Sequence, residues 1–473
     1  MSDNPQVNSQ THFDLIVVGG GPGGYGTALY GTSAGLNVAI IEKDAMGGTC
    51  LNRGCIPAKA FLETAAVQRH VAGAAEFGIE SSAPTVNFQV SQQRKQRIVD
   101  GIVKNLTGFM KSKKITIFSG VGSLGAGRQV TVAHPDGASS TITADHVVLA
   151  TGSIPRTISG FAAGGPIMTS DEVLMLDYIP ARLAVIGGGA IGCEFASTFA
   201  DLGSKVTILE GLPKILPGLD SDVANVVLRS FTKRSIDIRT GVTVTGHTPD
   251  ERGGTTVHFG DEHLEVDVVV VSVGRKPFAD QLGLEGTAVQ VSNRGFVEVD
   301  PWCRTGEPGV YAVGDLINTP QLAHVGYAEA ILVVKDILGE DPLPVAYDRV
   351  PWAIYCHPEV AFVGPSEEAA RQAGIEVVVA KHQFRANSRA QILGELDGLV
   401  KIIARKDANG GAGQILGVHM VGPWVTEQLS GGYLAVNWEA TVAEAAAFIQ
   451  PHPSLTELFG ETVLSLTGRS LNT

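Results

Sequence analysis

The stretch DLIVVGGGPGGYGTALYGTSAGLNVAIIEK (Asp14–Lys43) decides the fold, because RLAVIGGGAIGCEFASTFADLGSKVTILEG (Arg182–Gly211) repeats its pattern. Each copy opens with an apolar run typical of a strand, passes through G-x-G-x-x-G, continues with helical periodicity and enters a second, β-branched strand. The glycines of the two motifs are Gly19, Gly21, Gly24, Gly187, Gly189 and Gly192. The repeat predicts an α/β protein with two Rossmann-like dinucleotide-binding domains.

The glycine spacing suits a bound dinucleotide. The first glycine permits a tight turn, the second lets the backbone approach a pyrophosphate, and the third lets the helix pack on the strand. The helix N-terminus then faces the phosphates with its positive end. Each second strand ends in an acid, Glu42 or Glu210, which accepts hydrogen bonds from ribose hydroxyls and repels a 2′-phosphate. Glu210 therefore favours NAD over NADP, although Lys205 and Lys214 lie nearby in the sequence.

Length and composition limit the number of domains, the classes of partner and the location that can be expected. At 473 residues the chain exceeds the size at which one core stops growing, so several domains are expected. A net charge of −13 disfavours nucleic acid and anionic membranes as partners, and no apolar run is long enough to predict a membrane span. The polar start MSDNPQVNSQTH, read as a tail outside the fold, lacks the features of a signal or transit peptide. Five cysteines do not suit a secreted disulfide framework, which predicts a cytoplasmic protein.

Two cysteines, Cys50 and Cys55, follow the first repeat in GGTCLNRGCIPAK (Gly47–Lys59). In a straight helix a five-residue step separates two Cα atoms by roughly 8 to 9 Å, whereas a disulfide needs less than about 7 Å. A bond between these cysteines therefore requires a bent segment, for which Gly54 supplies the backbone freedom. Pro57 favours a helix start, which places Cys55 near a helix N-terminus that stabilises a thiolate. Two buried thiols are the alternative to a redox pair, whereas no neighbouring Cys or His completes a metal site.

The segments V-G-G-G-P-G-G (Val18–Gly24) and G-G-T-C-L-N-R-G-C-I-P-A-K (Gly47–Lys59) resemble the flavoprotein disulfide reductases, a family of pyridine-nucleotide disulfide oxidoreductases. The resemblance extends over nearly the whole chain. It implies FAD in the first fold, NAD in the second, and a C-terminal α+β dimerisation domain. It also implies that Cys55 is the thiolate nearest the flavin, that Cys50 attacks the substrate, and that the two form a redox-active disulfide.

Three further motifs of the family follow along the chain. They are Ala150–Gly152, Val273–Pro277 and Val310–Asp315. By resemblance, Thr151, Gly152, Gly274 and Asp315 contact the cofactors. The bare Gly-Asp pair that ends the third motif also fits an ordinary turn.

Lys59 and Glu194 resemble the family's ion pair beside the reactive face of the flavin. Glu194 interrupts an apolar helical stripe, and a carboxylate buried in such a stripe needs a partner. Two solvated surface charges are the alternative. We therefore expect Lys59 to bind the flavin and to pair with Glu194.

A histidine is the candidate for the proton that dithiol oxidation releases, because histidine titrates in the useful range. Of the 12 histidines, His357 and His452 precede proline, which holds the backbone extended. Ser454 and Glu457 fit a Ser-x-x-Glu capping box, which would give Glu457 a structural role. The family's His-Pro-x-x-x-Glu motif instead makes His452 the acid/base with Glu457 as its orienting partner, and leaves His357 as the competing candidate. Gln450 departs from the family, in which many members have a histidine at that position.

The sequence motifs also suggest where the domains begin and end. The expected division is an FAD-binding domain at 1–152, an NAD-binding domain at 153–276, a central segment at 277–346 that completes the FAD domain, and a dimerisation domain at 347–473. In the last domain Ile415–Val421 has the pattern of a buried strand. The resemblance implies a homodimer in which the helix after His452 serves the active site of the other subunit.

The activity implied by the resemblance is oxidation of protein-bound dihydrolipoamide to lipoamide, with reduction of NAD to NADH. The implied partners are the lipoyl domains and acyltransferase core of a 2-oxo acid dehydrogenase complex, or a glycine cleavage system. NADPH-dependent reductases of the glutathione or mycothione type are the nearest alternative, which Glu210 opposes. A mercuric reductase would carry a C-terminal cysteine pair, whereas this chain ends Gly-Arg-Ser-Leu-Asn-Thr. A binding protein with purely structural nucleotides is disfavoured by the presence of both Cys50 and Cys55.

Overall fold

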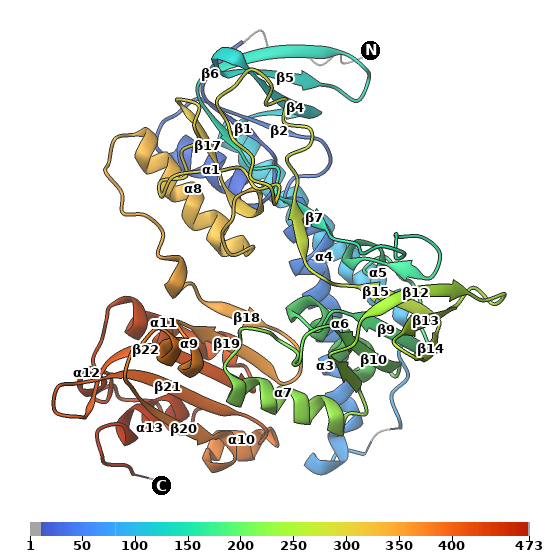
Figure 1. Cartoon of the computed structure of the whole chain (residues 1–473), viewed down its shortest axis with the longest axis vertical. Helices are drawn as coiled ribbons and strands as arrows, with labels where there is room; N and C mark the ends of the chain where they lie inside the picture. The colour runs from blue at the N-terminus through green and yellow to red at the C-terminus, as the bar shows by residue number, and fades with distance from the viewer. Residues whose placement is uncertain (1–10, 81, 472–473) are drawn as a thin grey trace. The chain divides into compact units, whose positions relative to one another are not determined.

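The computed structural model describes residues 11–80 and 82–471 and divides the chain into two compact units (Figure 1). Unit 1 comprises Met1–Pro57, Gln92–Arg156 and Arg275–Tyr347, and unit 2 comprises Ala58–Ser91, Thr157–Gly274 and Asp348–Thr473. The tail was expected at residues 1–12, of which 1–10 lie outside the described residues, whereas His12 already belongs to the first strand, β1. The four-part domain division expected from the sequence stays a prediction.

Unit 1 is built on a seven-stranded sheet in the order β3-β2-β1-β6-β5-β4, with β17 beside β6. The strands are β1 (His12–Val18), β2 (Val38–Glu42), β3 (Thr116–Ser119), β4 (Val121–Gly125), β5 (Gln129–Ala133), β6 (Ser139–Leu149) and β17 (Val310–Ala312). The pairs that involve β1, β2, β3 and β17 are parallel, whereas β4, β5 and β6 pair in an antiparallel manner. The central strands β1 and β2 are almost wholly apolar, as expected of parallel strands that are covered on both faces.

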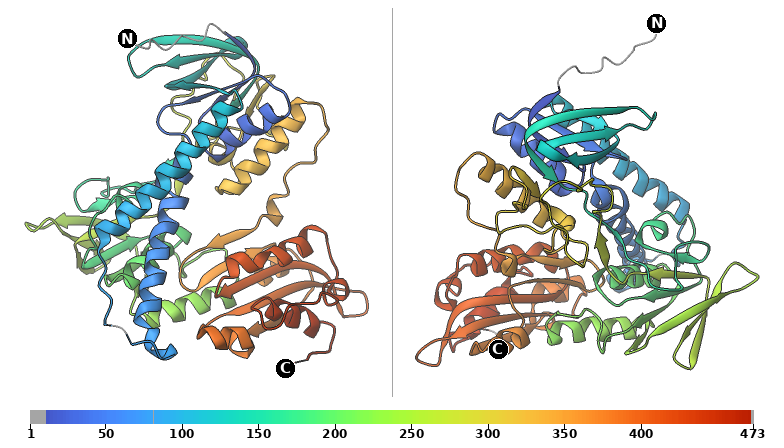
Figure 2. Two further views of the ribbon diagram at one scale, coloured as in Figure 1. Left: turned by 180° about the vertical axis from the view of Figure 1, so that it is seen from behind. Right: turned by 45° about the horizontal axis from the view of Figure 1, so that its top comes forward.

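Five helices belong wholly or partly to unit 1. They are α1 (Pro22–Ser33), α2 (Gly48–Arg53), α3 (Cys55–Ala72), α4 (Phe88–Ser112) and α8 (Ala323–Ile337), and a two-stranded ribbon joins β7 (Ser153–Pro155) to β16 (Arg275–Pro277). Figure 1 shows α1 beside α8, and a Cβ atom added to Gly26 would lie 3.2 Å from the Tyr327 ring. Figure 2 shows α3 beside α4, where the rings of Phe61 and Phe88 lie 5.0 Å apart. Small residues on α1 therefore permit the close approach of the helix that supports it.

Unit 2 begins with a second parallel sheet, in the order β11-β10-β9-β15-β8. Its elements are β8 (Ile167–Met168), α5 (Ser170–Val173), β9 (Arg182–Ile186), α6 (Ala190–Asp201), β10 (Lys205–Glu210), α7 (Ser221–Lys233), β11 (Asp237–Thr240) and β15 (Val268–Val271). An antiparallel meander follows β11, formed by β12 (Val244–Pro249), β13 (Thr255–Phe259) and β14 (Glu262–Val266). With β1 and β2 of unit 1, these parallel strands confirm the α/β fold with two dinucleotide folds.

The C-terminal part of unit 2 is an antiparallel sheet in the order β18-β19-β22-β21-β20. Its elements are β18 (Trp352–Ile354), β19 (Glu359–Val363), α9 (Glu367–Gln372), β20 (Val377–Gln383), α10 (Ser388–Leu393), β21 (Leu399–Lys406), β22 (Ala412–Gly422), α11 (Val425–Asn437), α12 (Val442–Ala445) and α13 (Glu457–Ser465). Helix α11 packs on β19 and β22, and α13 packs on β20 and β21. The buried strand expected at Ile415–Val421 lies within β22, so the predicted α+β domain is confirmed.

Short 3₁₀ turns complete the described elements. They are η1 (Ala74–Phe77), η2 (Ala126–Arg128), η3 (Gly314–Leu316), η4 (Tyr347–Arg349) and η5 (Phe384–Ala386). Among the helices of residues 11–80 and 82–471, none combines the length and the apolar content needed to cross a lipid bilayer.

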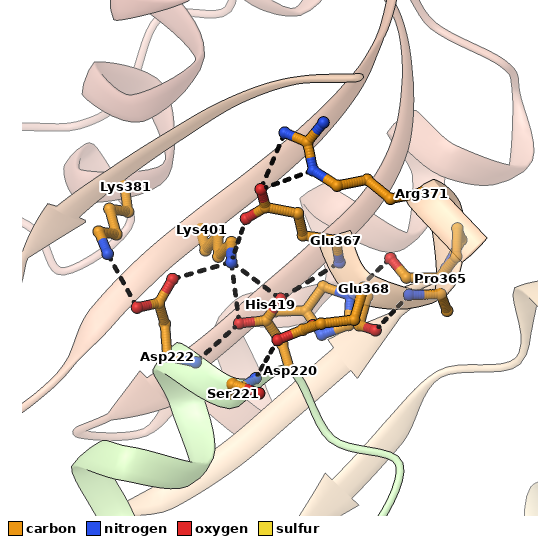
Figure 3. A network of polar contacts seen from close by, with 12 residues as sticks. Asp220, Ser221, Asp222, Pro365, Glu367, Glu368, Arg371, Lys381, Lys401 and His419 are labelled. Atoms are coloured by element: carbon orange, nitrogen blue, oxygen red, sulfur yellow. Dashed lines mark hydrogen bonds and ion pairs between the residues drawn. The ribbon is translucent and has the colours of Figure 1, made fainter. Parts of the chain in front are cut away.

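A cluster of charged side chains joins two helix starts inside unit 2 (Figure 3). Lys401 of β21 is 3% exposed, and its Nζ atom lies 2.9 Å from Asp220, 2.8 Å from Asp222 and 2.8 Å from Glu367. Asp220 is fully buried and is the N-cap of α7, and it also accepts a hydrogen bond from the first backbone N–H of α9 at 3.2 Å. Glu368 of α9 accepts a 3.3 Å hydrogen bond from Ser221 of α7 in return.

This cluster provides hydrogen-bond acceptors for the backbone N–H groups at the starts of two helices. The first N–H groups of a helix lack partners within the helix and carry a partial positive charge, which the carboxylates neutralise. Burial lowers the pKa of Lys401, but the hydrogen bonds that its ammonium group donates to the carboxylates outweigh burial and raise that pKa above its ordinary value. The ammonium group of Lys401 therefore stays charged and holds α7 of the second dinucleotide fold against the C-terminal sheet.

The cluster predicts a strong dependence of stability on Lys401. Lys401→Met should lower the free energy of unfolding by about 3–5 kcal/mol, because it leaves the fully buried carboxylate of Asp220 without its cation. Lys406→Met on the same strand is the control, since Lys406 and its partner Glu376 are 43% and 77% exposed. That control should change the free energy by at most about 1 kcal/mol. Urea unfolding followed by circular dichroism measures both, and equal effects would contradict the buried cluster.

Candidate active site

The two glycine loops are braced by the acids that end the second strand of each fold. Glu42 accepts hydrogen bonds from the backbone N–H groups of Gly20 at 2.7 Å and Asp44 at 2.8 Å. Glu210 accepts the equivalent bonds from Gly188 at 2.5 Å and from Leu212 at 2.7 Å. Burial raises the pKa of Glu42, although its backbone hydrogen bonds oppose that rise. Each carboxylate oxygen has a second lone pair, so both acids can brace the loop and still accept a ribose hydroxyl.

The glycines of the second loop fit a bound dinucleotide. A Cβ atom at Gly192 would lie 2.0 Å from the carbonyl oxygen of Gly187, so this position must be glycine for the helix to pack. Gly187 itself has a φ of +106°, which L side chains rarely adopt. A Cβ atom at Gly189 meets no atom within 4 Å, so the space in front of this glycine is open for a ligand. The steric roles expected for the three glycines are therefore present, and the loop fits a pyrophosphate.

The segment that carries the two cysteines is bent, as the sequence predicted. Helix α2 ends at Arg53, Gly54 has a φ of −142° and a ψ of −106°, and α3 begins at Cys55. A Cβ atom at Gly54 would lie 3.1 Å from the carbonyl oxygen of Thr49, which favours glycine at the bend. Cys50 therefore lies in α2 and Cys55 in the first turn of α3, and both are half-buried. This arrangement fits a redox-active disulfide whose second sulfur lies at a helix N-terminus.

Two tyrosines that the sequence did not single out lie beside the cysteines. Tyr25 of α1 and Tyr327 of α8 join their hydroxyl groups in a hydrogen bond, and their ring centroids are 5.7 Å apart. Burial raises the pKa of both tyrosines, and the charges of Cys50 and Cys55 raise it further. No motif marks this pair, because the two residues are far apart in the sequence and meet only where α1 packs on α8.

Asp315 is held by Ser153, which directly follows the motif at 150–152, and by Arg275 of the motif at 273–277. The Ser153 hydroxyl donates a 2.5 Å hydrogen bond to Asp315, and the Arg275 guanidinium lies 3.9 Å from the same carboxylate. Arg275 also donates to the Ser153 side chain at 2.7 Å and approaches the Thr49 hydroxyl at 3.4 Å. The Thr151 hydroxyl donates a 2.6 Å hydrogen bond to a backbone carbonyl oxygen. Ser153 and Arg275 therefore connect the segment after the first motif and the motif at 273–277 to Asp315, and the sequence had singled out neither of these two residues.

The ion pair expected between Lys59 and Glu194 is present. The Lys59 Nζ atom lies 2.9 and 2.8 Å from the two oxygens of Glu194, whose side chain is 10% exposed. The backbone N–H of Tyr355 donates a 2.9 Å hydrogen bond to Glu194, and the Lys59 ammonium lies 4.8 Å from the centre of the Tyr355 ring. Lys59 follows Cys55 by four residues on α3, a spacing that places two side chains on one face of a helix. The sequence missed Tyr355, which orients both members of the ion pair.

His452 and Glu457 also form the expected pair. The His452 Nδ1 atom lies 2.8 Å from one oxygen of Glu457, and the other oxygen accepts a 2.7 Å hydrogen bond from the backbone N–H of Ser454. The Ser454 hydroxyl contacts Thr456 instead of the helix, and Thr456 is the N-cap of α13. Only half of the expected capping box is therefore formed, because Glu457 shares its carboxylate between the cap and the histidine.

His357 is poorly suited to be the base. Burial lowers its pKa to about 3, and the nearby charges of Arg69 and Arg234 lower it too. Its backbone N–H donates to the Ser197 side chain at 2.9 Å, and its carbonyl oxygen accepts from Arg234 at 2.7 Å. A base with so low a pKa is almost unprotonated near pH 7 and drives proton transfer weakly. His357 therefore has a structural role in the loop that also contains Tyr355.

The chain belongs to the pyridine nucleotide-disulphide oxidoreductase family. Residues 13–330 match the family's model, and residues 350–463 match the model of its dimerisation domain. The second match supports a homodimer. The family, together with the two glycine loops, identifies FAD and NAD as the cofactors of this chain.

Known proteins resemble the chain along nearly its whole length. It is 37% identical to a dihydrolipoyl dehydrogenase of Bacillus subtilis, and the alignment covers 98% of this chain and 99% of that protein. A dihydrolipoyl dehydrogenase of Chlamydia muridarum is 39% identical, with 96% of each chain covered. Among solved structures, LpdA of Mycobacterium tuberculosis has a TM-score of 0.90 and 26% identity over 96% of this chain and 99% of that one. The HOCl-induced flavoprotein disulfide reductase RclA of Escherichia coli has a TM-score of 0.85 and 26% identity, covering 95% and 99%.

The surroundings of Gly189 and Gly192 predict that one substitution affects NAD binding and the other affects stability. Gly189→Ala should leave the free energy of unfolding within about 1 kcal/mol of the wild type, because its Cβ atom enters open space. We expect it to weaken NAD binding on the order of tenfold or more, because the methyl group occupies the position a pyrophosphate must approach. Gly192→Ala should instead lower the free energy of unfolding by about 1–3 kcal/mol through a backbone clash. Equilibrium NAD titration and urea unfolding test both variants, and an equal loss of stability in the two would refute this separation.

Proposed function

We propose that the chain is a dihydrolipoamide dehydrogenase, which oxidises a protein-bound dihydrolipoamide and reduces NAD. One observation carries the proposal: dihydrolipoyl dehydrogenases of Bacillus subtilis, Chlamydia muridarum and Haloferax volcanii are 37%, 39% and 36% identical to it along nearly the whole chain. The bent cysteine segment adds the chemistry that such a dithiol oxidation needs.

The residues divide into three groups by their proposed roles. Gly19, Gly21, Gly24, Glu42, Thr151, Gly152 and Asp315 bind FAD, with Lys59 beside its reactive ring, and Gly187, Gly189, Gly192, Glu210 and Gly274 bind NAD. Cys50 and Cys55 form the redox disulfide. His452 is the acid/base and Glu457 orients it. Glu194 forms an ion pair with Lys59 and so keeps its ammonium group in place.

The reaction begins with proton removal from the dithiol. His452 of the partner subunit takes the proton through Nε2, because its Nδ1 side faces Glu457, whose carboxylate stabilises the resulting charge. The substrate thiolate attacks the sulfur of Cys50, forms a mixed disulfide and releases Cys55 as a thiolate. Position 55 suits that negative charge because it begins a helix.

The second half of the reaction closes the product disulfide and leaves the electrons on the enzyme. The second substrate thiol attacks the substrate sulfur bound to Cys50 and passes its own proton to the sulfur of Cys50, which leaves as a thiol. The product disulfide is then closed, and His452 of the partner subunit still carries the first proton. The enzyme dithiol now holds the two electrons that the substrate has lost. When bound, FAD would supply the remaining chemistry, which is the transfer of that electron pair from the thiols to NAD as a hydride.

The proposed partners follow from the proposed substrate. A lipoyl group is carried on a protein domain, so the partners are lipoyl domains and the acyltransferase core of a 2-oxo acid dehydrogenase complex, or a glycine cleavage system. The cytoplasmic location expected from the cysteine content stays a prediction.

A side-by-side assay tests the proposed activity. We expect the holoenzyme to reduce NAD with dihydrolipoamide, and to reduce NADP far more slowly because Glu210 opposes a 2′-phosphate. Glutathione disulfide with NADPH is the control for the alternative class of disulfide reductase. Rapid turnover of that control together with an inert dihydrolipoamide reaction would overturn the proposal.

The role of His452 is tested by comparing two reactions of one variant. His452→Gln should slow dihydrolipoamide oxidation by about 10²–10⁴-fold, because the dithiol loses its base. Electron transfer from NADH to an artificial acceptor needs no dithiol proton, so its rate should stay at the wild-type level. His357→Gln is the matched control and should preserve both reactions. Equal losses in the two reactions of His452→Gln would refute its role as base.

A further inference from the structure

Glu329 is a fully buried carboxylate in α8 to which the mechanism assigns no role. Its Oε2 atom accepts a 2.6 Å hydrogen bond from the backbone N–H of Gly314. Its Oε1 atom accepts hydrogen bonds from the hydroxyl groups of Thr319 at 2.8 Å and Tyr347 at 3.1 Å. Burial raises the pKa of Glu329 to about 7, although these hydrogen bonds oppose the rise. Placing a carboxylate in such a site is unfavourable, so its position calls for an explanation.

The two oxygens of Glu329 hold both ends of one loop. Gly314 begins the loop after β17 and Thr319 ends it before α8, and the intervening residues include the turn η3. Within the loop, Ile317 donates a 3.0 Å backbone hydrogen bond to Gly314. The side chain of Asp315 lies in this loop and is 26% exposed. One buried carboxylate therefore joins two positions of the loop, and Ser153 donates a separate 2.5 Å hydrogen bond to Asp315.

The same helix also contacts the first glycine loop. A Cβ atom added to Gly326 of α8 would lie 3.1 Å from the backbone nitrogen of Gly23 in α1, and one added to Gly23 would lie 3.6 Å from the nitrogen of Gly314. The start of α1, the start of α8 and the Asp315 loop thus meet through backbone atoms. Glu329 lies one turn along α8 from that contact, so it couples the loop to the helix that supports the phosphate-binding turn.

We propose that Glu329 is a positioning residue for FAD, which acts by holding the loop at 314–319 so that Asp315 faces the cofactor. The proposal rests on the assignment of Asp315 to FAD under the proposed function. Glu329 itself does not touch the cofactor. Its contribution is to replace the freedom of a glycine-containing loop with one fixed geometry, which reduces the entropy lost when FAD binds.

The test measures FAD release from the holoenzyme by the rise in flavin fluorescence after dilution. Glu329→Leu removes the acceptor of three partly buried donors that hold the loop, so we expect FAD to dissociate about tenfold faster. Glu329→Gln keeps an acceptor for Gly314 and donates to the two hydroxyl groups, so its release rate should match the wild type. Glu340→Leu, a change of the same kind at an exposed position just beyond α8, is the control and should have no effect.

A double-mutant cycle with Asp315→Asn separates positioning from general support. If Glu329 acts through Asp315, Glu329→Leu adds little to the release rate in the Asp315→Asn background. A wild-type release rate in Glu329→Leu, or its full effect in that background, would overturn the proposal. Thr319→Val covers the case in which the leucine variant does not fold: faster release supports the proposal and an unchanged rate refutes it. FAD release needs no dithiol, so an enzyme inactive on dihydrolipoamide that still shows this pattern refutes the proposed substrate and supports the role of Glu329.

Discussion

Backbone N–H groups in the first turn of a helix have no partner within that helix, and the fold repeatedly uses groups from elsewhere to satisfy them. At the two glycine loops, Glu42 and Glu210 fix the turn and leave the starts of α1 and α6 open to a ligand. In unit 2, Asp220 accepts hydrogen bonds from the first turns of both α7 and α9. Cys55 begins α3, where the same kind of unpartnered N–H groups would stabilise a thiolate. One backbone property thus contributes to ligand binding, to thiolate stabilisation and to the joint between two sheets.

The functional carboxylates share a second design. Glu194, Glu329 and Glu457 each accept one hydrogen bond from a backbone N–H, and each directs a further bond to a side chain. For Glu194 and Glu457 that side chain is Lys59 or His452, the group proposed to do the chemistry. A backbone donor is fixed by the fold, so it fixes the plane of the carboxylate and hence the position of the partner. Lys59 and His452 are thus each held by a carboxylate that the backbone keeps in place.

Much of the fold and of the candidate site was predictable, because the sequence signals are either short local motifs or a pattern that occurs twice. The two dinucleotide folds follow from glycine spacing and strand pattern, and the bend between Cys50 and Cys55 follows from a helix being too straight for a disulfide. The pairing of His452 with Glu457 needed only a short motif. The predicted capping box was only half correct, because a sequence pattern cannot show that the Glu457 carboxylate binds both His452 and the backbone of Ser454.

The residues that the sequence missed are defined by contacts that only the folded chain shows. Glu329 closes its loop from a neighbouring helix, and the contact between Tyr25 and Tyr327 depends on how two helices pack. Tyr355 lies in a loop that is distant in sequence from Lys59 and Glu194, and its contacts with both residues form only in the folded chain. Composition and periodicity carry no signal for such contacts, since each side chain alone has an ordinary position in its own element.

The buried ammonium of Lys401 has a consequence for behaviour on heating. Hydration of charged groups becomes less favourable as temperature rises, so the desolvation penalty of a buried ion cluster shrinks while apolar burial levels off. The contact of α7 with the C-terminal sheet therefore gains relative strength at high temperature. Thermal unfolding of unit 2 should accordingly begin in segments held by apolar packing alone, with the helix starts around Asp220 among the last to separate.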